Sequence, residues 1–301
     1  MSPSAPFRFA GATAVLTGAA SGIGEQLAHG LAARGTHLVL LDRDAAGLET
    51  VAGAIRAGHP DLPVRTVVAD LAELSALPGV AERIRAEHPR IDLLVNNAGV
   101  GLGGTFEQVS AEEFDWLMDI NFRAPVVLTR ELLPALLAAP GSHLVNLSSL
   151  FGLIAPPGQV AYSASKYALR GFSEGLRHEL AGRVGVTVVH PGGVRTRIAE
   201  TARTPAGVSA ERARKDREDF AALLSYPAER AAADILGAVE RRRNRLLVAP
   251  SAVLPDLVAR VLPGSYWPVL RHAPRVLRHA PRVLKHAPRV LRRLPGRRRR
   301  A

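Results

Sequence analysis

The sequence of 301 residues predicts an α/β protein of three layers, in which a doubly wound, mainly parallel sheet lies between two layers of helices. Three observations predict this fold. Short aliphatic runs alternate with longer segments of helical period. Runs such as Leu38–Leu41 are apolar on both faces, as strands of a covered parallel sheet are. No linker rich in Pro, Gly or Ser interrupts the alternation before about residue 195.

The elements follow one another in a regular order, so right-handed crossovers are expected between parallel strands. The predicted strands are Ala12–Thr17, Thr36–Leu41, Val64–Ala69, Ile91–Val95, His143–Leu147, Val184–His190 and Leu246–Ala249. The predicted helices are Ile23–Arg34, Ala45–Ala57, Leu74–His88, Ala111–Leu137, Tyr162–Leu180 and Pro227–Arg241. Between Arg195 and Tyr226 the pattern loosens into a polar segment. It either folds over a ligand at the end of a late strand or forms an ordinary surface helix pair.

The net charge of +12 is concentrated in the C-terminal tail. Residues 271–301 hold 11 Arg and one Lys with no acid, whereas residues 1–270 hold 27 basic and 27 acidic residues. A pI near 11.2 therefore describes the tail and not the body. We expect residues 1–250 to form one globular domain and residues 251–301 to form a basic C-terminal extension.

Several classes of site are excluded by composition. The chain has no Cys, so a disulfide framework, a thiolate nucleophile and a Cys-ligated metal are absent. His143, His178 and His190 lack metal-ligand spacing, and no metal is expected. The N-terminus lacks the pattern of a secretory signal, and no long apolar run is free of charge or Pro. We therefore expect a cytoplasmic protein.

A glycine-rich turn follows the first predicted strand and has the sequence Thr17-Gly18-Ala19-Ala20-Ser21-Gly22-Ile23-Gly24. Glycine there lets backbone N–H groups approach a pyrophosphate, next to the positive end of a helix. The second strand ends at Asp42, whose carboxylate can accept hydrogen bonds from ribose hydroxyls and would repel a 2′-phosphate. Arg43 could instead pair with such a phosphate. NAD is therefore favoured, and NADP is the alternative.

A tyrosine and a lysine lie four residues apart on a predicted helix. Tyr162 and Lys166 share one helix face, so the ammonium can approach the phenol. A nearby cation favours the phenolate and so lowers the pKa of a tyrosine that acts in proton transfer. Ser149, just past the fifth strand, could donate a hydrogen bond to a substrate oxygen.

Together these signals resemble the classical short-chain dehydrogenase/reductase family over about residues 10–200. The residues that carry the resemblance are Thr17-Gly18-x3-Gly22-Ile23-Gly24, Asp70-Leu71, Asn96-Asn97-Ala98-Gly99, Asn121, Ser148-Ser149, Tyr162-Ser163-Ala164-Ser165-Lys166 and Pro191-Gly192-Gly193-Val194-Arg195-Thr196.

The resemblance implies an NAD(P)-dependent oxidoreductase that acts on secondary alcohols or ketones, with a seven-stranded Rossmann-type sheet and a homo-oligomeric assembly. Tyr162 would be the general acid/base, Lys166 would hold the nicotinamide ribose and lower the pKa of Tyr162, Ser149 would orient the substrate oxygen, and Asn121 would position a water in a proton relay. The implied cofactor-binding residues are Thr17, Gly18, Ser21, Gly22, Ile23, Gly24, Asp42, Arg43, Asp70, Leu71, Asn97, Ala98, Gly99, Tyr162, Lys166, Pro191, Gly192, Val194 and Thr196.

Two alternatives stay open at this stage. The fold could serve as a nucleotide-binding scaffold or sensor without turnover. The apolar stretches at residues 150–157 and 102–104 suit a hydrophobic substrate, but they equally suit ordinary core packing. NADH consumption with a carbonyl substrate would separate an enzyme from a scaffold.

The tail contains a seven-residue repeat outside the family resemblance: Arg271–Leu277, Arg278–Leu284 and Lys285–Leu291. On a helical wheel its apolar residues fall on one side and its basic residues on the other, although each repeat contains a Pro. The tail could be a solvated arm, a peripheral anchor at an anionic membrane surface, or, least favoured, a nucleic-acid arm.

Overall fold

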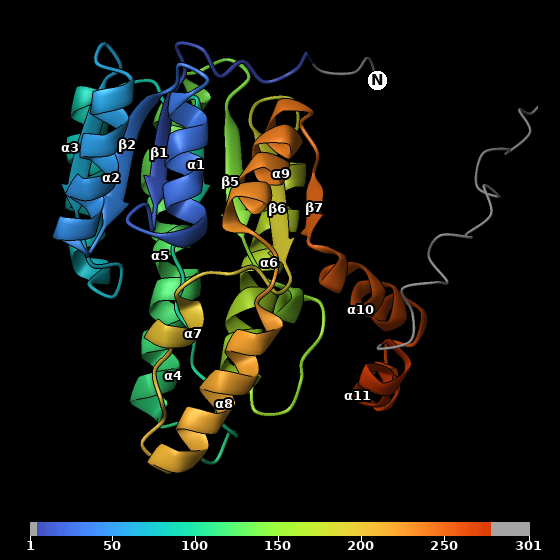
Figure 1. Cartoon of the computed structure of the whole chain (residues 1–301). Helices are drawn as coiled ribbons and strands as arrows, with labels where there is room; N and C mark the ends of the chain where they lie inside the picture. The colour runs from blue at the N-terminus through green and yellow to red at the C-terminus, as the bar shows by residue number, and fades with distance from the viewer. Residues whose placement is uncertain (1–4, 278–301) are drawn as a thin grey trace, which may run out of the picture. The chain divides into compact units, whose positions relative to one another are not determined.

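A computed structural model describes residues 5–277, with side chains described to residue 271. The chain divides into two compact units, Met1–Asp256 and Leu257–Ala301. The first unit contains a seven-stranded sheet of order β3-β2-β1-β4-β5-β6-β7, and every pair of neighbouring strands is parallel (Figure 1). The predicted fold is therefore confirmed. The strands are β1 Thr13–Thr17, β2 His37–Asp42, β3 Val64–Val68, β4 Leu93–Asn96, β5 His143–Leu147, β6 Gly185–Pro191 and β7 Arg245–Val248.

Helices cover both faces of this sheet. Successive strand residues alternate between two cores: Leu16 belongs to one core, and Val15 belongs to the other. The first core is closed by α1 Gly22–Ala32, α2 Ala45–Gly58 and α9 Ala228–Glu240. The second is closed by α3 Leu77–Glu87, α5 Ala124–Leu137 and α6 Val160–Glu179. Two short 3₁₀ turns, η1 Leu74–Ala76 and η3 Leu150–Gly152, precede α3 and α6.

The strand order reverses between β1 and β4. The chain winds outward from β1 to β3 in one direction and from β4 to β7 in the other. In open sheets of this kind the carboxyl ends of the strands at the reversal leave a crevice between diverging loops. The topology therefore places the loops after β1, β4 and β5 around one opening.

One predicted helix is interrupted. The segment predicted as a single helix, Ala111–Leu137, contains α4 Ala111–Met118, a π-helical turn η2 at Asp119–Arg123, and α5. Pro125 explains part of this, because it has no N–H to donate to the carbonyl of Asn121 four residues earlier. π-helical turns are frequent at functional sites.

The segment between β6 and α9 is more regular than its polar sequence predicts. It forms α7 Ile198–Thr201 and α8 Ala210–Leu223, and α8 begins where the Ser209 hydroxyl accepts a hydrogen bond from the N–H of Arg212 at 3.3 Å. Ala, Arg and Glu favour helix there.

Two further helices follow β7: α10 Pro250–Val261 and α11 Tyr266–Leu277. The first seven-residue repeat, Arg271–Leu277, lies within α11, and the later repeats lie outside the described residues. A search of the described part of the chain finds no helix long and apolar enough to span a membrane.

Candidate active site

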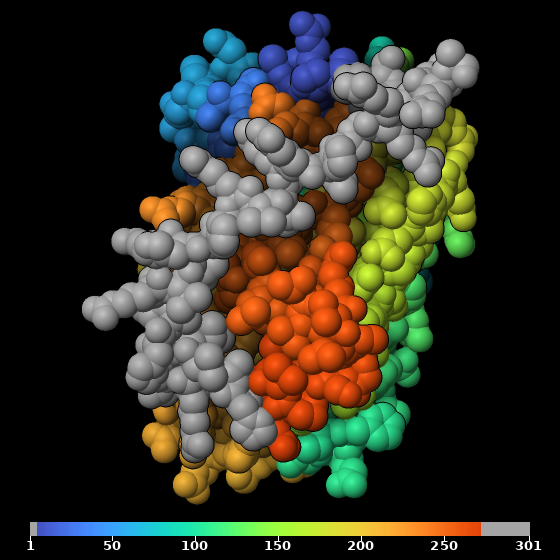
Figure 2. All heavy atoms as spheres, turned by 90° about the vertical axis from the view of Figure 1, so that its right-hand side faces the viewer, coloured from blue at the N-terminus to red at the C-terminus, as the bar shows by residue number. Residues whose placement is uncertain are grey.

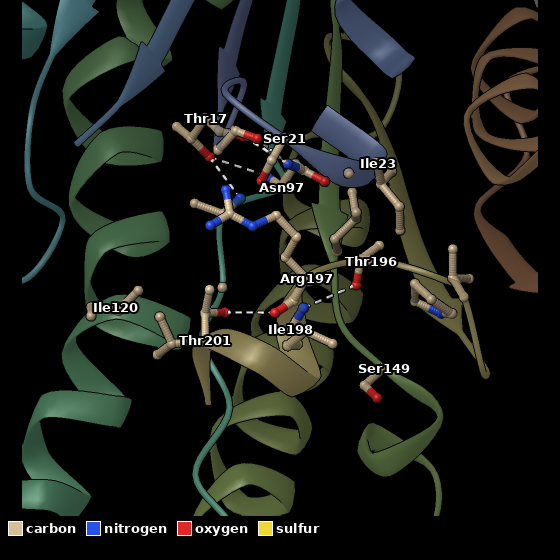
Figure 3. A pocket seen from close by; sticks show the side chains of 18 of the residues that line it. Thr17, Ser21, Ile23, Asn97, Ile120, Ser149, Thr196, Arg197, Ile198 and Thr201 are labelled. Atoms are coloured by element: carbon tan, nitrogen blue, oxygen red, sulfur yellow. Dashed lines mark hydrogen bonds between the residues drawn. The ribbon is translucent and has the colours of Figure 1, made fainter. Parts of the chain in front are cut away.

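A cavity of about 510 Å³ opens at the carboxyl ends of the central strands. Figure 3 shows it from close by, with residues from the loops after β1, β4, β5 and β6 facing one space. Every residue predicted for the site lines this cavity except Gly24 and Asn121. The structure therefore brings together segments that are up to about 180 residues apart in the sequence.

The turn after β1 requires glycine for two separate reasons. Gly18 and Gly22 have φ angles of 68° and 60°, a region that disfavours side chains. Gly24 lies in the first turn of α1, and a Cβ added there would come 1.9 Å from the carbonyl oxygen of Gly18. The chain can thus turn sharply and keep its N–H groups close to the cavity.

Thr17 and Asn97 hold this turn against the loop after β4. The Thr17 hydroxyl accepts hydrogen bonds from the N–H groups of Asn97 and Ala98, both at 3.1 Å (Figure 3). The Asn97 side-chain amide donates to the carbonyls of Thr17 at 2.9 Å and Gly18 at 3.1 Å. These four hydrogen bonds fix the turn against the loop after β4, and such preorganisation lowers the conformational entropy that ligand binding must overcome.

Asp42 closes the other side of the same turn. Its Oδ2 accepts a hydrogen bond from the N–H of Ala20 at 3.0 Å, and its Oδ1 accepts one from the N–H of Asp44 at 3.1 Å. Arg43 is exposed and also lines the cavity. Asp70 and Leu71, which follow β3, complete this end of the cavity. Carboxylates of Asp42, Asp44 and Asp70 and the guanidinium of Arg43 therefore lie at this end of the cavity.

Ser149 and Tyr162 lie at the opposite end of the cavity. The Ser149 hydroxyl accepts a hydrogen bond from the N–H of Phe151 at 3.1 Å and is hydrogen-bonded to the Tyr162 side chain. Burial raises the pKa of Tyr162 above its ordinary value, and the hydrogen bond with Ser149 opposes this effect only in part. The predicted lowering of this pKa is therefore not found. The sequence shows the nearby cation, but it does not show how deeply the phenol is buried.

Lys166 lies beneath the tyrosine ring and is 3% exposed. Its ammonium donates a hydrogen bond to the Leu147 carbonyl at 3.0 Å and is 5.8 Å from the centre of the Tyr162 ring. Burial lowers the pKa of Lys166 to about 8. A Cβ at Gly99 would lie 3.1 Å from this ammonium, so the glycine leaves room for it. A desolvated cation and a desolvated phenol thus share one wall of the cavity.

Asn121 lies behind that wall rather than on it. Its side chain is fully buried on the π-helical turn, donates to the Val100 carbonyl at 3.0 Å and accepts from the Val100 N–H at 2.9 Å. It also donates to the Ser165 hydroxyl at 3.2 Å. Its Oδ1 is one of the atoms that a Cβ at Gly99 would approach, at 3.2 Å. Asn121 therefore joins the π-helical turn to the loop after β4 and to α6.

The cavity is closed by the segment after β6. Pro191, Gly192, Val194 and Thr196 line it as predicted, and a Cβ at Gly22 would lie 3.2 Å from Thr196. The cavity also has lining residues that were not predicted. Figure 3 shows Arg197 reaching into the cavity, and Ile198 and Thr201 of α7 line it as well. The end of α8 adds Phe220, Leu223 and Leu224. The segment between Arg195 and Tyr226 gave no signal in its sequence for these contacts beyond its position after a late strand.

The apolar stretches at residues 150–157 and 102–104 differ in their surroundings: the first contributes to the cavity wall, and the second contributes to core packing. Leu150 and Phe151 line the cavity, whereas Leu102 is 2% exposed and packs in a small core with Leu117 and Ala161. Within the part of the chain that the structure describes, no cluster of three or more His, Cys, Asp or Glu side chains could hold a metal ion.

Comparison with known proteins identifies a protein family and several relatives of this sequence. Residues 12–207 match the family model described as short chain dehydrogenase. The chain is 38% identical over 267 residues to a Mycobacterium tuberculosis protein named as the oxidoreductase SadH, which covers 86% of this chain and 93% of that protein. It is 35% identical to the dehydrogenase/reductase SDR family member 7B of Xenopus laevis, over 79% of this chain and 74% of that protein.

Solved structures agree with the sequence relatives. A short chain dehydrogenase/reductase from Burkholderia phymatum in complex with NAD is 29% identical, has a TM-score of 0.77, and aligns over 85% of this chain and 95% of its own. A short-chain dehydrogenase from Sphingobium yanoikuyae in complex with NADPH is 29% identical with a TM-score of 0.69, over 92% of this chain and 98% of its own.

Proposed function

The chain belongs to the short-chain dehydrogenase/reductase family of oxidoreductases, and from this membership we propose that it interconverts a secondary alcohol and a ketone with NAD(H) as cofactor. The observation that carries the proposal is the meeting of Ser149, Tyr162 and Lys166 in one cavity with the glycine-rich turn. Reaction of NADH with a panel of ketones, and of NAD with the matching alcohols, would test it.

The residues around the cavity fit a dinucleotide. At Gly18 an added Cβ would lie 2.8 Å from the Cα of Ala98, and at Gly24 it would meet the Gly18 carbonyl, so both positions keep the turn open for phosphate. We propose that the turn holds the pyrophosphate, that Asp70 and Leu71 contact the adenine, and that Asn97 to Gly99 line the cofactor. The segment from Pro191 to Thr196 would flank the nicotinamide.

The side chains supply proton transfer and alignment. When bound, the nicotinamide ring supplies or accepts the hydride. We propose that the Tyr162 hydroxyl exchanges a proton with the substrate oxygen and that Ser149 donates a hydrogen bond to that oxygen. A phenol whose pKa is raised by burial is protonated at neutral pH, which suits proton donation to a ketone. Lys166 would hold the nicotinamide ribose, and Asn121 would position a water behind it.

The choice of NAD over NADP rests on Asp42. The carboxylate is held at the end of β2 by two backbone N–H groups, and we propose that its negative charge would repel the 2′-phosphate of NADP. The neighbouring Arg43 would act in the opposite direction, because its guanidinium could pair with a 2′-phosphate. The related structures carry either cofactor, one with NAD and another with NADPH, so the comparison is compatible with both.

A hydrophobic substrate is proposed from the lining near Tyr162. Leu150, Phe151 and Phe220 lie on the cavity wall together with Leu223, which is otherwise 67% exposed. An apolar ligand that covers these side chains would remove about 25 cal/mol of unfavourable hydration per Å² of apolar surface buried. The alternative function, a nucleotide-binding protein without turnover, would appear as NADH binding with no NADH consumption.

We further propose that the C-terminal extension attaches the enzyme peripherally to an anionic membrane surface. Residues 257–301 contain thirteen Lys and Arg and no acid. On α10, Ala252 and Asp256 are buried, and the opposite helix face presents Val253, Leu257 and Val261 at 52%, 56% and 68% exposure. Positive charge alone would also suit nucleic acid, but an exposed apolar helix face that precedes it in the sequence favours a lipid interface.

Figure 2 draws the heavy atoms of α10 and α11 as spheres, coloured orange to red. From the family resemblance we also propose that the protein is a homo-oligomer and that it resides in the cytoplasm. Sedimentation of the full chain would measure its oligomeric state.

A further inference from the structure

The backbone of Ser149 is held by a histidine that none of the motifs include. His190 lies on β6, and its Nδ1 is 3.0 Å from the Ser149 carbonyl oxygen. We propose that His190 is a positioning residue, which fixes the peptide of Ser149 and thereby the direction of its hydroxyl toward Tyr162. The inference rests on the proposed function, because it assigns Ser149 a part in the reaction.

The strand ladder cannot hold Ser149 by itself. Its last bond beyond β5 joins the N–H of Ser148 to the Val189 carbonyl at 2.9 Å. The next bond of a parallel ladder would start from the N–H of Pro191, and proline has none. The chain after Ser148 therefore leaves the sheet, and the His190 side chain supplies a donor one residue beyond the end of the ladder.

The hydrogen-bonding partner settles which ring nitrogen of His190 carries the proton. A carbonyl oxygen can only accept, so Nδ1 must donate. His190 is fully buried, and burial lowers its pKa to about 4, so the ring is neutral at neutral pH and Nε2 carries no proton. Nε2 is itself buried and without a hydrogen-bond partner among the described residues. His143 has the same arrangement of one bonded and one unpartnered ring nitrogen, so His190 is distinguished by the residue that it contacts.

Packing alone does not require a histidine at position 190. A leucine would fill a similar volume and would leave no buried nitrogen without a hydrogen-bond partner. The one contact that leucine could not reproduce is the hydrogen bond to Ser149. The Ser149 hydroxyl in turn accepts from Phe151 and bonds to Tyr162, so a rotation of this peptide would misdirect the group proposed to orient the substrate.

His143 offers a matched control. It is 1% exposed, and its Nε2 is hydrogen-bonded to the Thr187 hydroxyl at 2.7 Å, while its Nδ1 has no partner among the described residues. It is the first residue of β5, so it lies at the other end of the strand from Ser149. A buried histidine with a purely structural part is therefore available in the same sheet.

The test compares His190→Leu, His190→Asn and His143→Leu with the unmodified full chain. The Asn side chain can place an amide N–H near the position of Nδ1. With the most reactive ketone of the panel, His190→Leu should lower kcat by about 10- to 100-fold, because displacing a group in the site by about 1 Å can cost that much. NADH dissociation constants should change less than twofold, and His190→Asn should recover most of kcat. His143→Leu should lower the melting temperature and keep kcat.

Unchanged kcat in His190→Leu, or an equal loss in His143→Leu, would overturn the inference. An unmodified enzyme that reduces no ketone would instead overturn the proposed function. In that case, imidazole ¹⁵N spectra test which ring nitrogen of His190 carries the proton, because they do not depend on turnover. The signal lost in His190→Asn should show a neutral ring protonated at Nδ1, and a ring protonated at Nε2 would contradict the assignment.

Discussion

The N–H of Ala20, in the glycine-rich turn, donates a hydrogen bond to the Asp42 carboxylate over 3.0 Å. The residue proposed to select the cofactor therefore also supports the turn proposed to hold its phosphates. Any substitution of Asp42 affects both, and a test of selectivity must separate the charge from the hydrogen bond.

Asp42→Asn removes the charge and keeps an acceptor oxygen for Ala20, but its NH2 group cannot accept the hydrogen bond that Oδ1 receives from the N–H of Asp44. We expect the ratio of NADPH to NADH dissociation constants to fall by about tenfold or more, since a repulsion between unit charges at 4 Å is worth about 1–4 kcal/mol. Asp42→Ala, which also removes the acceptor, should weaken both cofactors. Tighter binding of NADPH than NADH to the unmodified enzyme would contradict the assignment of Asp42.

Gly24→Ala tests the close packing of the glycine-rich turn. The new Cβ would lie 1.9 Å from the Gly18 carbonyl oxygen, so the turn must shift. We expect a loss of roughly 1–3 kcal/mol of stability and at least tenfold weaker NADH binding. Gly53→Ala is the control, because nothing lies within 4 Å of its added Cβ on α2. That change should stabilise by about 0.5–1 kcal/mol and leave NADH affinity unchanged.

His143 should make the free energy of unfolding depend on pH. Burial lowers the pKa of this ring from 6.5 to about 3, so between these values the unfolded chain binds a proton that the folded chain does not. Stability from this residue is therefore complete above pH 6.5 and falls as the pH drops toward 3, by at most about 1.4 kcal/mol per pH unit. His143→Gln retains a polar group and does not titrate. Urea unfolding between pH 7 and 4 should show a shallower decline for this variant, and parallel curves would refute the prediction.

Binding to lipid should require both the charge and the apolar face of the extension. The full chain should co-sediment with vesicles that contain phosphatidylserine and not with neutral vesicles, and a chain ending at Leu270 should bind more weakly. Leu257→Ser should reduce binding, whereas Val68→Ser, at an equally exposed apolar residue on β3, should not. If binding depends on charge alone, the extension attaches by electrostatic attraction and the apolar face has no part in it. If the full chain binds neither kind of vesicle, the membrane proposal is refuted.

Sequence patterns predicted most of the sheet because its central strands, such as β1 and β2, are apolar on both faces and are flanked by turn residues. β5, for example, has the predicted bounds His143–Leu147. Many of the cavity residues were also predictable, since they follow directly after strands, whereas Arg197 and the residues that line the cavity from α7 and α8 were not. Features that depend on tertiary packing were not. The π-helical turn at Asn121, the raised pKa of Tyr162 and the contact of His190 with Ser149 arise from burial and from neighbours far along the chain.

The most direct test of the proposed reaction is the turnover of Tyr162→Phe. This change removes the hydroxyl that would exchange the proton and keeps the ring that packs against Phe151. Turnover of the most reactive ketone should fall by roughly 10²–10⁴, with NADH affinity preserved. Tyr167→Phe, on the same helix, should retain turnover. A Tyr162→Phe enzyme that reduces the ketone at the unmodified rate would contradict the proposal that this tyrosine is the acid and base of the reaction.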